Sequence, residues 1–161
     1  FQDNRGKFSR LFCASEMLEF DLEVSISQVN ISKTDKKGTI RGMHYQDEGF
    51  AEDKYITCLK GSIFDVALDV RRDSETFLKW DSEILSSEED KMIFIPKGIA
   101  HGFQTLEDDC WLLYLHTEKY QPNSEAGLNP LDPRLAIAWP LSVENISEKD
   151  NNRKYLKGNS L

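Results

Sequence analysis

Residues 62–71 read Ser-Ile-Phe-Asp-Val-Ala-Leu-Asp-Val-Arg. Within this stretch a large apolar residue occupies every second position from Phe64 to Val70, and Asp or Ala fills the positions between them. A period of two is the mark of a β-strand, because successive side chains of a strand point to opposite faces of the sheet. We therefore predict a strand over Ser62–Arg71.

The same strand signal recurs along the chain. Short runs rich in β-branched and aromatic residues are separated by turn signals, such as Lys37-Gly38, Lys60-Gly61, Pro96-Lys97-Gly98 and Asp108-Asp109. Many short strands at this spacing are typical of an all-β sandwich, barrel or jelly roll. Weak helical signals lie near the two ends, at Ser15–Phe20 and Ser147–Leu156. The further predicted strands are Val24–Asn30, Thr39–Gln46, Tyr55–Lys60, Met92–Ile95 and Trp111–His116.

The bulk composition limits the class of protein. The 161 residues suit one domain, which we expect to cover 1–161. A net charge of −8 disfavours nucleic acid or an anionic membrane as partner, and no apolar run is long enough for a membrane span. Three widely separated cysteines, Cys13, Cys58 and Cys110, favour the reducing cytoplasm over a disulfide framework. Because the chain begins at Phe1 without a signal-peptide pattern, we expect a short leader to be missing or trimmed.

Histidine is the residue type best suited to proton transfer near neutral pH, and the chain has only three, at positions 44, 101 and 116. His44 lies in a glycine-flanked stretch, three residues after Arg41, and His101 follows the Pro96-Lys97-Gly98 turn. Glycine permits close approach of a ligand to the backbone. These surroundings favour a functional role for His44 and His101.

The segment Pro96–His101 resembles the second cupin motif, which raises a metal-dependent cupin as one alternative. Such a site needs two histidines and a carboxylate. The earlier motif reads His44-Tyr45-Gln46, and glutamine is a poor ligand for these metals. We therefore expect no metal and no cofactor. A histidine base would then act through its own proton affinity, with a carboxylate on its other ring nitrogen to orient it.

A series of motifs runs in order along nearly the whole chain. They are Phe1-x-Asp3-x-Arg5-Gly6, Gln28-Val29-Asn30, residues 38–46 (Gly-Thr-Ile-Arg-Gly-Met-His-Tyr-Gln), Lys54, Gly61-x-x-x-Asp65-Val66-Ala67-x-Asp69-x-Arg71, Pro96–Phe103, Tyr114 to Tyr120-x-Pro122, Asp132-Pro133 to Trp139-Pro140 and Ile146-Ser-Glu-Lys-Asp150. Together they resemble the dTDP-4-dehydrorhamnose 3,5-epimerase family. The resemblance implies a cupin-type double-stranded β-helix (jelly roll) that epimerises a nucleotide-diphosphate-linked 4-keto-6-deoxy sugar without a cofactor.

The resemblance also implies a role for each matching residue. A ketone at C4 acidifies the protons at C3 and C5, so a base can remove one and form an enolate. By resemblance, His44 is the base, Asp150 is its partner, and Tyr114 delivers a proton from the opposite face. Lys54 would stabilise the enolate oxygen, as a fixed cation does for developing charge. The residues that match contacts to the diphosphate and the sugar are Arg5, Gln28, Asn30, Arg41, His101 and Tyr120.

Two positions depart from the family pattern. Arg10 stands where the family usually has Glu, and Lys119 stands where an aromatic residue is common. The resemblance associates both positions with base recognition, so thymidine, guanosine, cytidine and uridine carriers stay open. Two alternative functions also stay open: a mono-epimerase (C3 or C5 only) or keto-sugar isomerase, and a non-catalytic sugar-binding cupin. Finally, the resemblance implies a homodimer in which an N-terminal strand crosses to the partner's sheet.

Overall fold

The computed structural model describes residues 2–22, 24–47 and 49–157, so Phe1 of the opening motif lies outside the described residues. The elements in chain order are β1 (Gln2–Asp3), β2 (Gly6–Lys7), α1 (Ala14–Met17), the 3-10 turn η1 (Leu18–Phe20), β3 (Gln28–Thr34), β4 (Thr39–Gln46), β5 (Lys54–Lys60), β6 (Ser62–Asp69), β7 (Trp80–Ser86), β8 (Met92–Ile95), β9 (Ile99–Thr105), β10 (Cys110–His116), the 3-10 turn η2 (Pro122–Ser124), β11 (Glu125–Gly127), β12 (Asn145–Ile146) and α2 (Glu148–Asn151).

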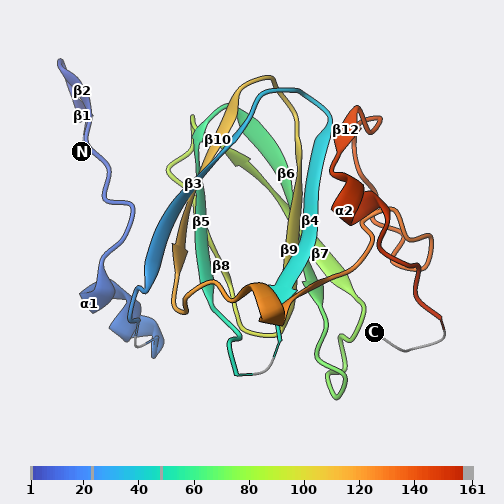
Figure 1. Ribbon diagram of the computed structural model, residues 1–161. Coiled ribbons are helices and arrows are strands. Elements are labelled where there is room, and N and C mark those ends of the chain that lie inside the picture. Colours follow the sequence, from blue (N-terminus) through green and yellow to red (C-terminus); the bar gives the residue numbers. More distant parts are fainter. Residues whose placement is uncertain (1, 23, 48, 158–161) are drawn as a thin grey trace.

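Two sheets enclose the barrel that Figure 1 shows. The smaller sheet has the order β3-β10-β5-β8, and the larger has the order β11-β4-β9-β6-β7. Every pairing in this barrel is antiparallel except that of β12, which runs parallel to β4. The predicted all-β jelly roll with short helices near the ends is confirmed.

The strand predicted over Ser62–Arg71 is β6, and both of its faces are buried. Its even positions pack on the outside of the larger sheet, where Val66 and Leu68 join a cluster with residues of the C-terminal segment. Its odd positions point into the barrel, where Ile63 joins the inner core and Asp65 is almost fully buried. The strand ends at Asp69 because the carboxylate of Asp69 accepts hydrogen bonds from the backbone and the guanidinium of Arg71.

The prediction for Val24–Asn30 was wrong in its bounds. The strand β3 begins at Gln28 and continues to Thr34. Its limits are set by its neighbour, because all seven residues pair with β10, from Gln28 opposite His116 to Thr34 opposite Cys110. Of the described residues before Gln28, Ser27 still donates its backbone N–H to the oxygen of His116, but β10 ends there, and residues 24–26 belong to no strand.

Two long strands, β7 and β9, were not predicted. Gly102 and the polar residues of β9 mask its alternation, and the exposed residues of β7, which are Asp81, Glu83 and Ile84, do not alternate regularly with buried ones. The helix predicted over Ser147–Leu156 was too long, because α2 covers only Glu148–Asn151. The prediction for Ser15–Phe20 matches the end of α1 and the turn η1.

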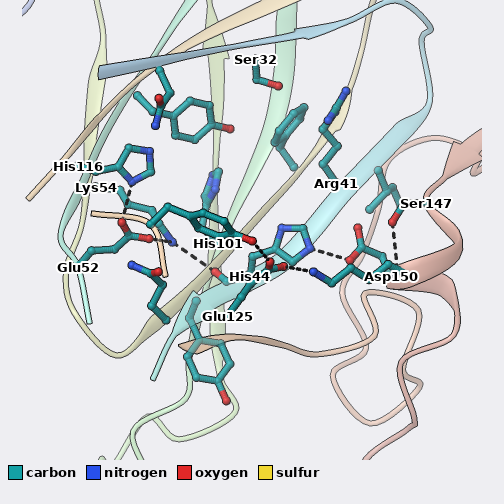
Figure 2. Close-up of a pocket in the computed structure, with 18 of the residues that line it drawn as sticks. Ser32, Arg41, His44, Glu52, Lys54, His101, His116, Glu125, Ser147 and Asp150 are labelled. Atoms are coloured by element: carbon teal, nitrogen blue, oxygen red, sulfur yellow. Dashed lines mark hydrogen bonds and ion pairs between the residues drawn. The ribbon is translucent and has the colours of Figure 1, made fainter. Parts of the chain in front are cut away.

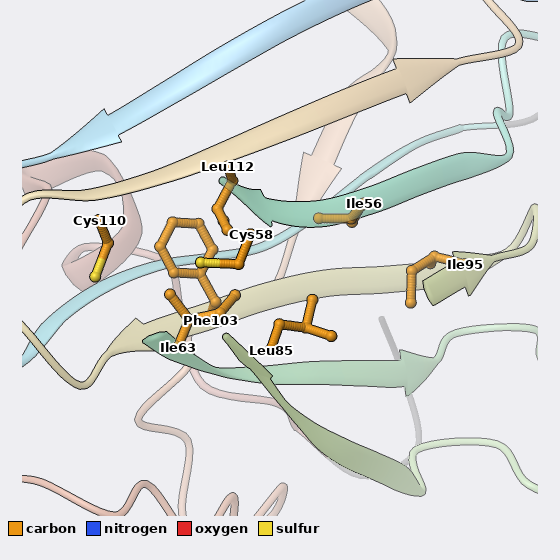
Figure 3. Packing of buried hydrophobic residues seen from close by; sticks show 8 residues of the cluster. All are labelled: Ile56, Cys58, Ile63, Leu85, Ile95, Phe103, Cys110 and Leu112. Carbon is orange, nitrogen blue, oxygen red and sulfur yellow. The ribbon is translucent and has the colours of Figure 1, made fainter. Parts of the chain in front are cut away.

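The inner core fills one part of the barrel and leaves another part open. Residues at alternate positions of one strand share a face, so Lys54, Ile56 and Cys58 of β5 all point inward. Ile56 and Cys58 lie in the inner core, whereas Lys54 lies in a cavity. Burying each large apolar side chain contributes about 1.5–3 kcal/mol. The cluster, drawn in Figure 3, consists of Ile56, Cys58, Ile63, Leu85, Ile95, Phe103, Cys110 and Leu112.

The N-terminal segment lies beside the barrel and touches it at a few points, where Lys7 pairs with Asp90 and the ring of Phe12 meets that of Tyr55. Figure 1 shows the hairpin of β1 and β2 to the side of both sheets, at the opposite end of the segment from α1. Its described residues are exposed. In the described ranges, no helix is long and apolar enough to cross a membrane.

Candidate active site

A cavity of about 550 Å³ opens between the two sheets at the polar part of the barrel. This volume suits a small-molecule ligand. All four residues predicted to be catalytic line it, together with most of those predicted to bind substrate, as Figure 2 shows for several of them. The predicted residues that line the cavity are His44, Asp150, Tyr114, Lys54, Asn30, Arg41, His101 and Tyr120.

An irregularity in β4 brings Arg41 and His44 to the same wall of the cavity. Positions three apart on a regular strand face opposite sides of the sheet. Here the register between β4 and β9 shifts between Arg41 and His44, and both side chains line the cavity. Gly42 has a φ of +118°, and a Cβ atom at that position would lie 2.5 Å from the Cα of Gly102. Glycine is therefore required for this close approach of the strands.

Asp150 reaches His44 because the C-terminal segment is anchored on β4. β12 pairs with the beginning of β4, and the N-cap Ser147 accepts a hydrogen bond from the backbone N–H of Asp150. The Nε2 atom of His44 then lies 2.6 Å from Oδ1 of Asp150. Burial would raise the pKa of Asp150, but the hydrogen bond and charge of His44, together with hydrogen bonds from Ser147 and Gly42, hold that pKa below its ordinary value. Since an ionised carboxylate only accepts, Nε2 carries a hydrogen, and in the neutral imidazole Nδ1 has the lone pair that can take up a proton.

A second histidine–aspartate pair lies on the neighbouring strands. Nε2 of His101 donates to Oδ2 of Asp65 at 2.6 Å, and both side chains are buried. The ring of His101 meets Tyr114 edge-on, with the ring centroids 5.9 Å apart. Tyr114 comes from β10 in the smaller sheet, so it faces His44 of the larger sheet across the cavity. Burial raises the pKa of Tyr114 far above its ordinary value, so the phenol stays protonated and can act as a proton donor.

Lys54 takes part in a group that sequence reasoning missed. Its ammonium lies 3.3 Å from Oε1 of Glu52 and donates to the backbone oxygen of His44 at 3.4 Å. The other oxygen of Glu52 accepts from Nδ1 of His116 at 2.8 Å, and His116 stacks on Tyr114. A signal for both residues was present. Glu52 lies two positions before Lys54, and His116 lies two after Tyr114 on the same face of β10.

Gln28 and Tyr120 form a second group at the cavity. The backbone N–H of Tyr120 donates to Oε1 of Gln28 at 2.5 Å, so Gln28 supports the chain that carries Tyr120 and does not itself line the cavity. The hydroxyl of Tyr120 donates to Glu125 at 2.5 Å, and Glu125 also pairs with Lys149 at 2.6 Å. Neither Glu125 nor Lys149 was predicted. Glu125 lies outside the quoted motifs, and Lys149 lies in the motif that ends at Asp150 but was given no role.

Arg5 is the predicted substrate-binding residue that the fold leaves far from the others. It lies in the exposed N-terminal hairpin, where it pairs with Asp3 at 2.6 Å. Arg10 also lies in this segment and pairs with Glu16. Lys119 is exposed beside Tyr120, at the rim. A single chain therefore brings neither Arg5 nor Arg10 to the cavity.

The side-chain amide of Gln46 makes hydrogen bonds that hold the neighbouring loops in place. Its amide donates to the backbone oxygens of Phe50 and Lys119, and its oxygen accepts from the backbone of Gln121. Across residues 2–22, 24–47 and 49–157, no group of three His, Cys, Asp or Glu side chains has the arrangement of a metal site.

Fold and cavity are those of a cupin-type jelly roll with acid–base side chains in its interior. The family model described as dTDP-4-dehydrorhamnose 3,5-epimerase matches residues 1–158. An enzyme of that name from Methanothermobacter thermautotrophicus is 40% identical over all of this chain and 88% of its own length. The crystal structure of a Bacillus anthracis dTDP-4-dehydrorhamnose 3,5-epimerase, with TDP and PPi bound, superposes with a TM-score of 0.94 at 36% identity, covering 97% of this chain and 89% of that one.

A further relative differs in its name. The dTDP-4-dehydrorhamnose 3-epimerase of Streptomyces niveus is 34% identical over 96% of this chain and 74% of its own length. This protein belongs to the dTDP-4-dehydrorhamnose 3,5-epimerase family. It is an epimerase, an enzyme of the isomerase class.

Proposed function

We propose that this protein inverts C3 and C5 of a 4-keto-6-deoxy sugar linked to a nucleoside diphosphate, without a cofactor. The observation that carries the proposal is the pairing of His44 with Asp150 on one wall of a cavity whose other wall presents Tyr114. The names of the relatives favour thymidine as the nucleoside. Arg41 would bind the diphosphate, because a guanidinium matches two phosphate oxygens at once.

The reaction needs only proton transfers. Nδ1 of His44 removes the proton next to the ketone, and the electron pair of the broken C–H bond moves into an enolate. Asp150 stabilises the imidazolium that forms, and the ammonium of Lys54 stabilises the negative oxygen. The hydroxyl of Tyr114 then donates a proton to carbon from the opposite face, which inverts the centre. Exchange with water removes the proton that His44 gained and restores the one that Tyr114 lost. Because each hydrogen leaves carbon and returns to it as a proton, the proposed steps need no redox cofactor.

A second candidate is inversion of C3 alone. The relative from Streptomyces niveus that is named a 3-epimerase favours it. Both candidates use the same base, donor and cation, and they differ only in whether C5 is also presented to His44.

Isotope exchange tests the proposal and separates the two candidates. In deuterated water, the protein should incorporate deuterium at both C3 and C5 of a dTDP-linked 4-keto-6-deoxy sugar and give the doubly inverted product. Incorporation at C3 alone would establish the second candidate. The same sample treated with a chelator should react equally fast. A protein that binds the nucleotide sugar but catalyses no exchange at either carbon would contradict both candidates.

We also propose that the protein acts as a homodimer in which Arg5 completes the site of the partner. Arg5 lies on a hairpin that projects from the barrel, and β3 is an open edge of the smaller sheet. Val29 and Ile31 of β3 are 61% and 50% exposed, which is unusual for apolar side chains unless another surface covers them.

Mixing two inactive variants tests this arrangement. Arg5→Ala keeps its own His44, and His44→Asn keeps its own Arg5. If Arg5 acts across the interface, mixed dimers contain one intact site and regain up to half of the parent's activity per mixed dimer. If each chain uses its own Arg5, the mixture stays as inactive as its components. Light scattering at micromolar concentration should give twice the mass of the chain, and an active monomer would refute the proposal.

A further inference from the structure

His116, Glu52 and Lys54 form a connected row of polar side chains in the cavity. Figure 2 shows His116, Glu52 and Lys54 in sequence along one side of the cavity, with Asp150 on the other side. The two oxygens of Glu52 are divided between two partners, Lys54 at 3.3 Å and His116 at 2.8 Å. Both oxygens are therefore used, and the carboxylate is held in one orientation.

Lys54 is the group that depends on this carboxylate. Its side chain is 9% exposed, and burial lowers the pKa of Lys54, since a buried ammonium loses its hydration. The charge and the hydrogen bond of Glu52 act in the opposite direction and raise that pKa. Glu52 itself would be protonated more readily because of its burial, but the hydrogen bond from His116 and the charge of Lys54 bring the pKa of Glu52 below its ordinary value.

We propose that Glu52, oriented by His116, is a positioning residue that keeps Lys54 protonated and directs its ammonium into the cavity. The consequence for catalysis rests on the function proposed above, in which only a charged Lys54 can stabilise the enolate oxygen. Without Glu52, the ammonium would be a desolvated charge without a carboxylate, and it would release its proton at a lower pH.

The other titratable groups of the cavity do not replace Glu52. The two remaining histidines are each bound to a carboxylate of their own, and the tyrosine on β10 stays protonated. β8 places only the apolar Ile95 opposite Lys54. The carboxylate of Glu125 on β11 is bound to Tyr120 and Lys149. The titratable and charged groups on the strands around the cavity are Arg41, His44 and Tyr45 on β4, His101 on β9 with Asp65 on β6, Tyr114 and His116 on β10, and Glu125 on β11.

The direct test is the titration of Lys54 itself, followed by NMR through its ¹³Cε resonance in the free protein. Loss of a carboxylate within this distance shifts a titration by about 1–3 pH units. Glu52→Gln keeps the shape of the side chain and should lower the midpoint of Lys54 by that amount. The matched control is Glu83→Gln, which removes a lysine–glutamate pair with Lys91 on the exposed surface and should leave the midpoint of Lys54 unchanged. An unchanged midpoint in Glu52→Gln would overturn the proposal.

A second variant keeps the test decisive if Glu52→Gln folds poorly. His116→Phe retains an aromatic ring beside Tyr114 but cannot donate to Glu52. It should lower the midpoint of Lys54 by less than Glu52→Gln does and should reduce kcat with little change in KM. If the midpoint of Lys54 and kcat both match those of the parent, His116 does not orient Glu52.

The pH profile of catalysis separates this inference from the proposed function. In Glu52→Gln, the alkaline limb of kcat/KM should move to lower pH together with the titration of Lys54. If the NMR midpoint falls while the alkaline limb stays in place, Glu52 controls the charge of Lys54 as proposed. In that case, however, Lys54 does not stabilise the enolate, and the proposed function loses that step.

Discussion

Replacing His44 with asparagine should remove epimerisation and leave nucleotide affinity nearly intact. The asparagine side chain is too short to reach the Asp150 carboxylate that Nε2 of His44 contacts at 2.6 Å, but it keeps a polar group at the position of Nδ1. It has no basic nitrogen, however, so no proton can leave C3 or C5. General acid–base groups typically contribute about 10²–10⁴-fold, and we expect kcat to fall at least that far. Turnover of a dTDP-linked 4-keto-6-deoxy sugar and calorimetric binding of dTDP are the two measurements.

Asp150→Asn should show a weaker form of the same defect. It preserves the base but removes the charge that orients the imidazole and stabilises the imidazolium, so its loss of kcat should be smaller than that of His44→Asn. Exchange and inversion at the parent's rate in His44→Asn would show that another group removes the proton. A larger loss in Asp150→Asn than in His44→Asn would reverse the assigned roles of the two residues.

Replacing Tyr114 with phenylalanine should uncouple proton removal from inversion. The phenyl ring can keep the contacts that Tyr114 makes with His101 and His116, and only the hydroxyl is lost. His44 still removes the first proton, so exchange with deuterated water continues. The new proton must then return from the original face or from solvent, and the carbon is seldom inverted. We expect the ratio of exchange to inversion to rise at least tenfold, which corresponds to about 1.4 kcal/mol.

This outcome is measured by following deuterium content and stereochemistry in the same reaction. His101→Asn is a useful comparison, because it alters the neighbour of Tyr114 and leaves the hydroxyl in place. If Tyr114→Phe loses exchange and inversion in equal proportion, the phenol takes part in removing the proton as well as in replacing it. The separate roles assigned to His44 as base and Tyr114 as proton donor would then be wrong.

The strand pattern could be predicted from the sequence wherever alternation and turn residues coincide. Thr39–Gln46 and Met92–Ile95 were placed with their correct bounds for this reason. Where pairing with a neighbour sets the limits of a strand, the local pattern fails, as at Val24–Asn30. The irregularity at Gly42 is a property of two strands together, so no pattern within one strand could reveal that Arg41 and His44 share a wall.

The site was predicted by resemblance and not by local chemistry. Asp150 would pass for a surface carboxylate, and only the pairing of β12 with β4 brings it to His44. Glu52 and His116 were missed, although a local pattern could have identified them. The resemblance gave neither of them a role, yet their positions relative to Lys54 and Tyr114 on neighbouring strands could have been found by counting alternate residues.

The anchoring of α2 on β4 has a consequence for the order in which parts of the active site form during folding. His44 and Asp150 are separated by 106 positions, and His116 and Glu52 by 64. Contacts between such distant parts of a chain form slowly, because a large loop must close before they contribute any stability. A nascent chain leaving the ribosome carries its base long before it carries the carboxylate that orients that base. During refolding, recovery of turnover should therefore lag behind the appearance of β-structure.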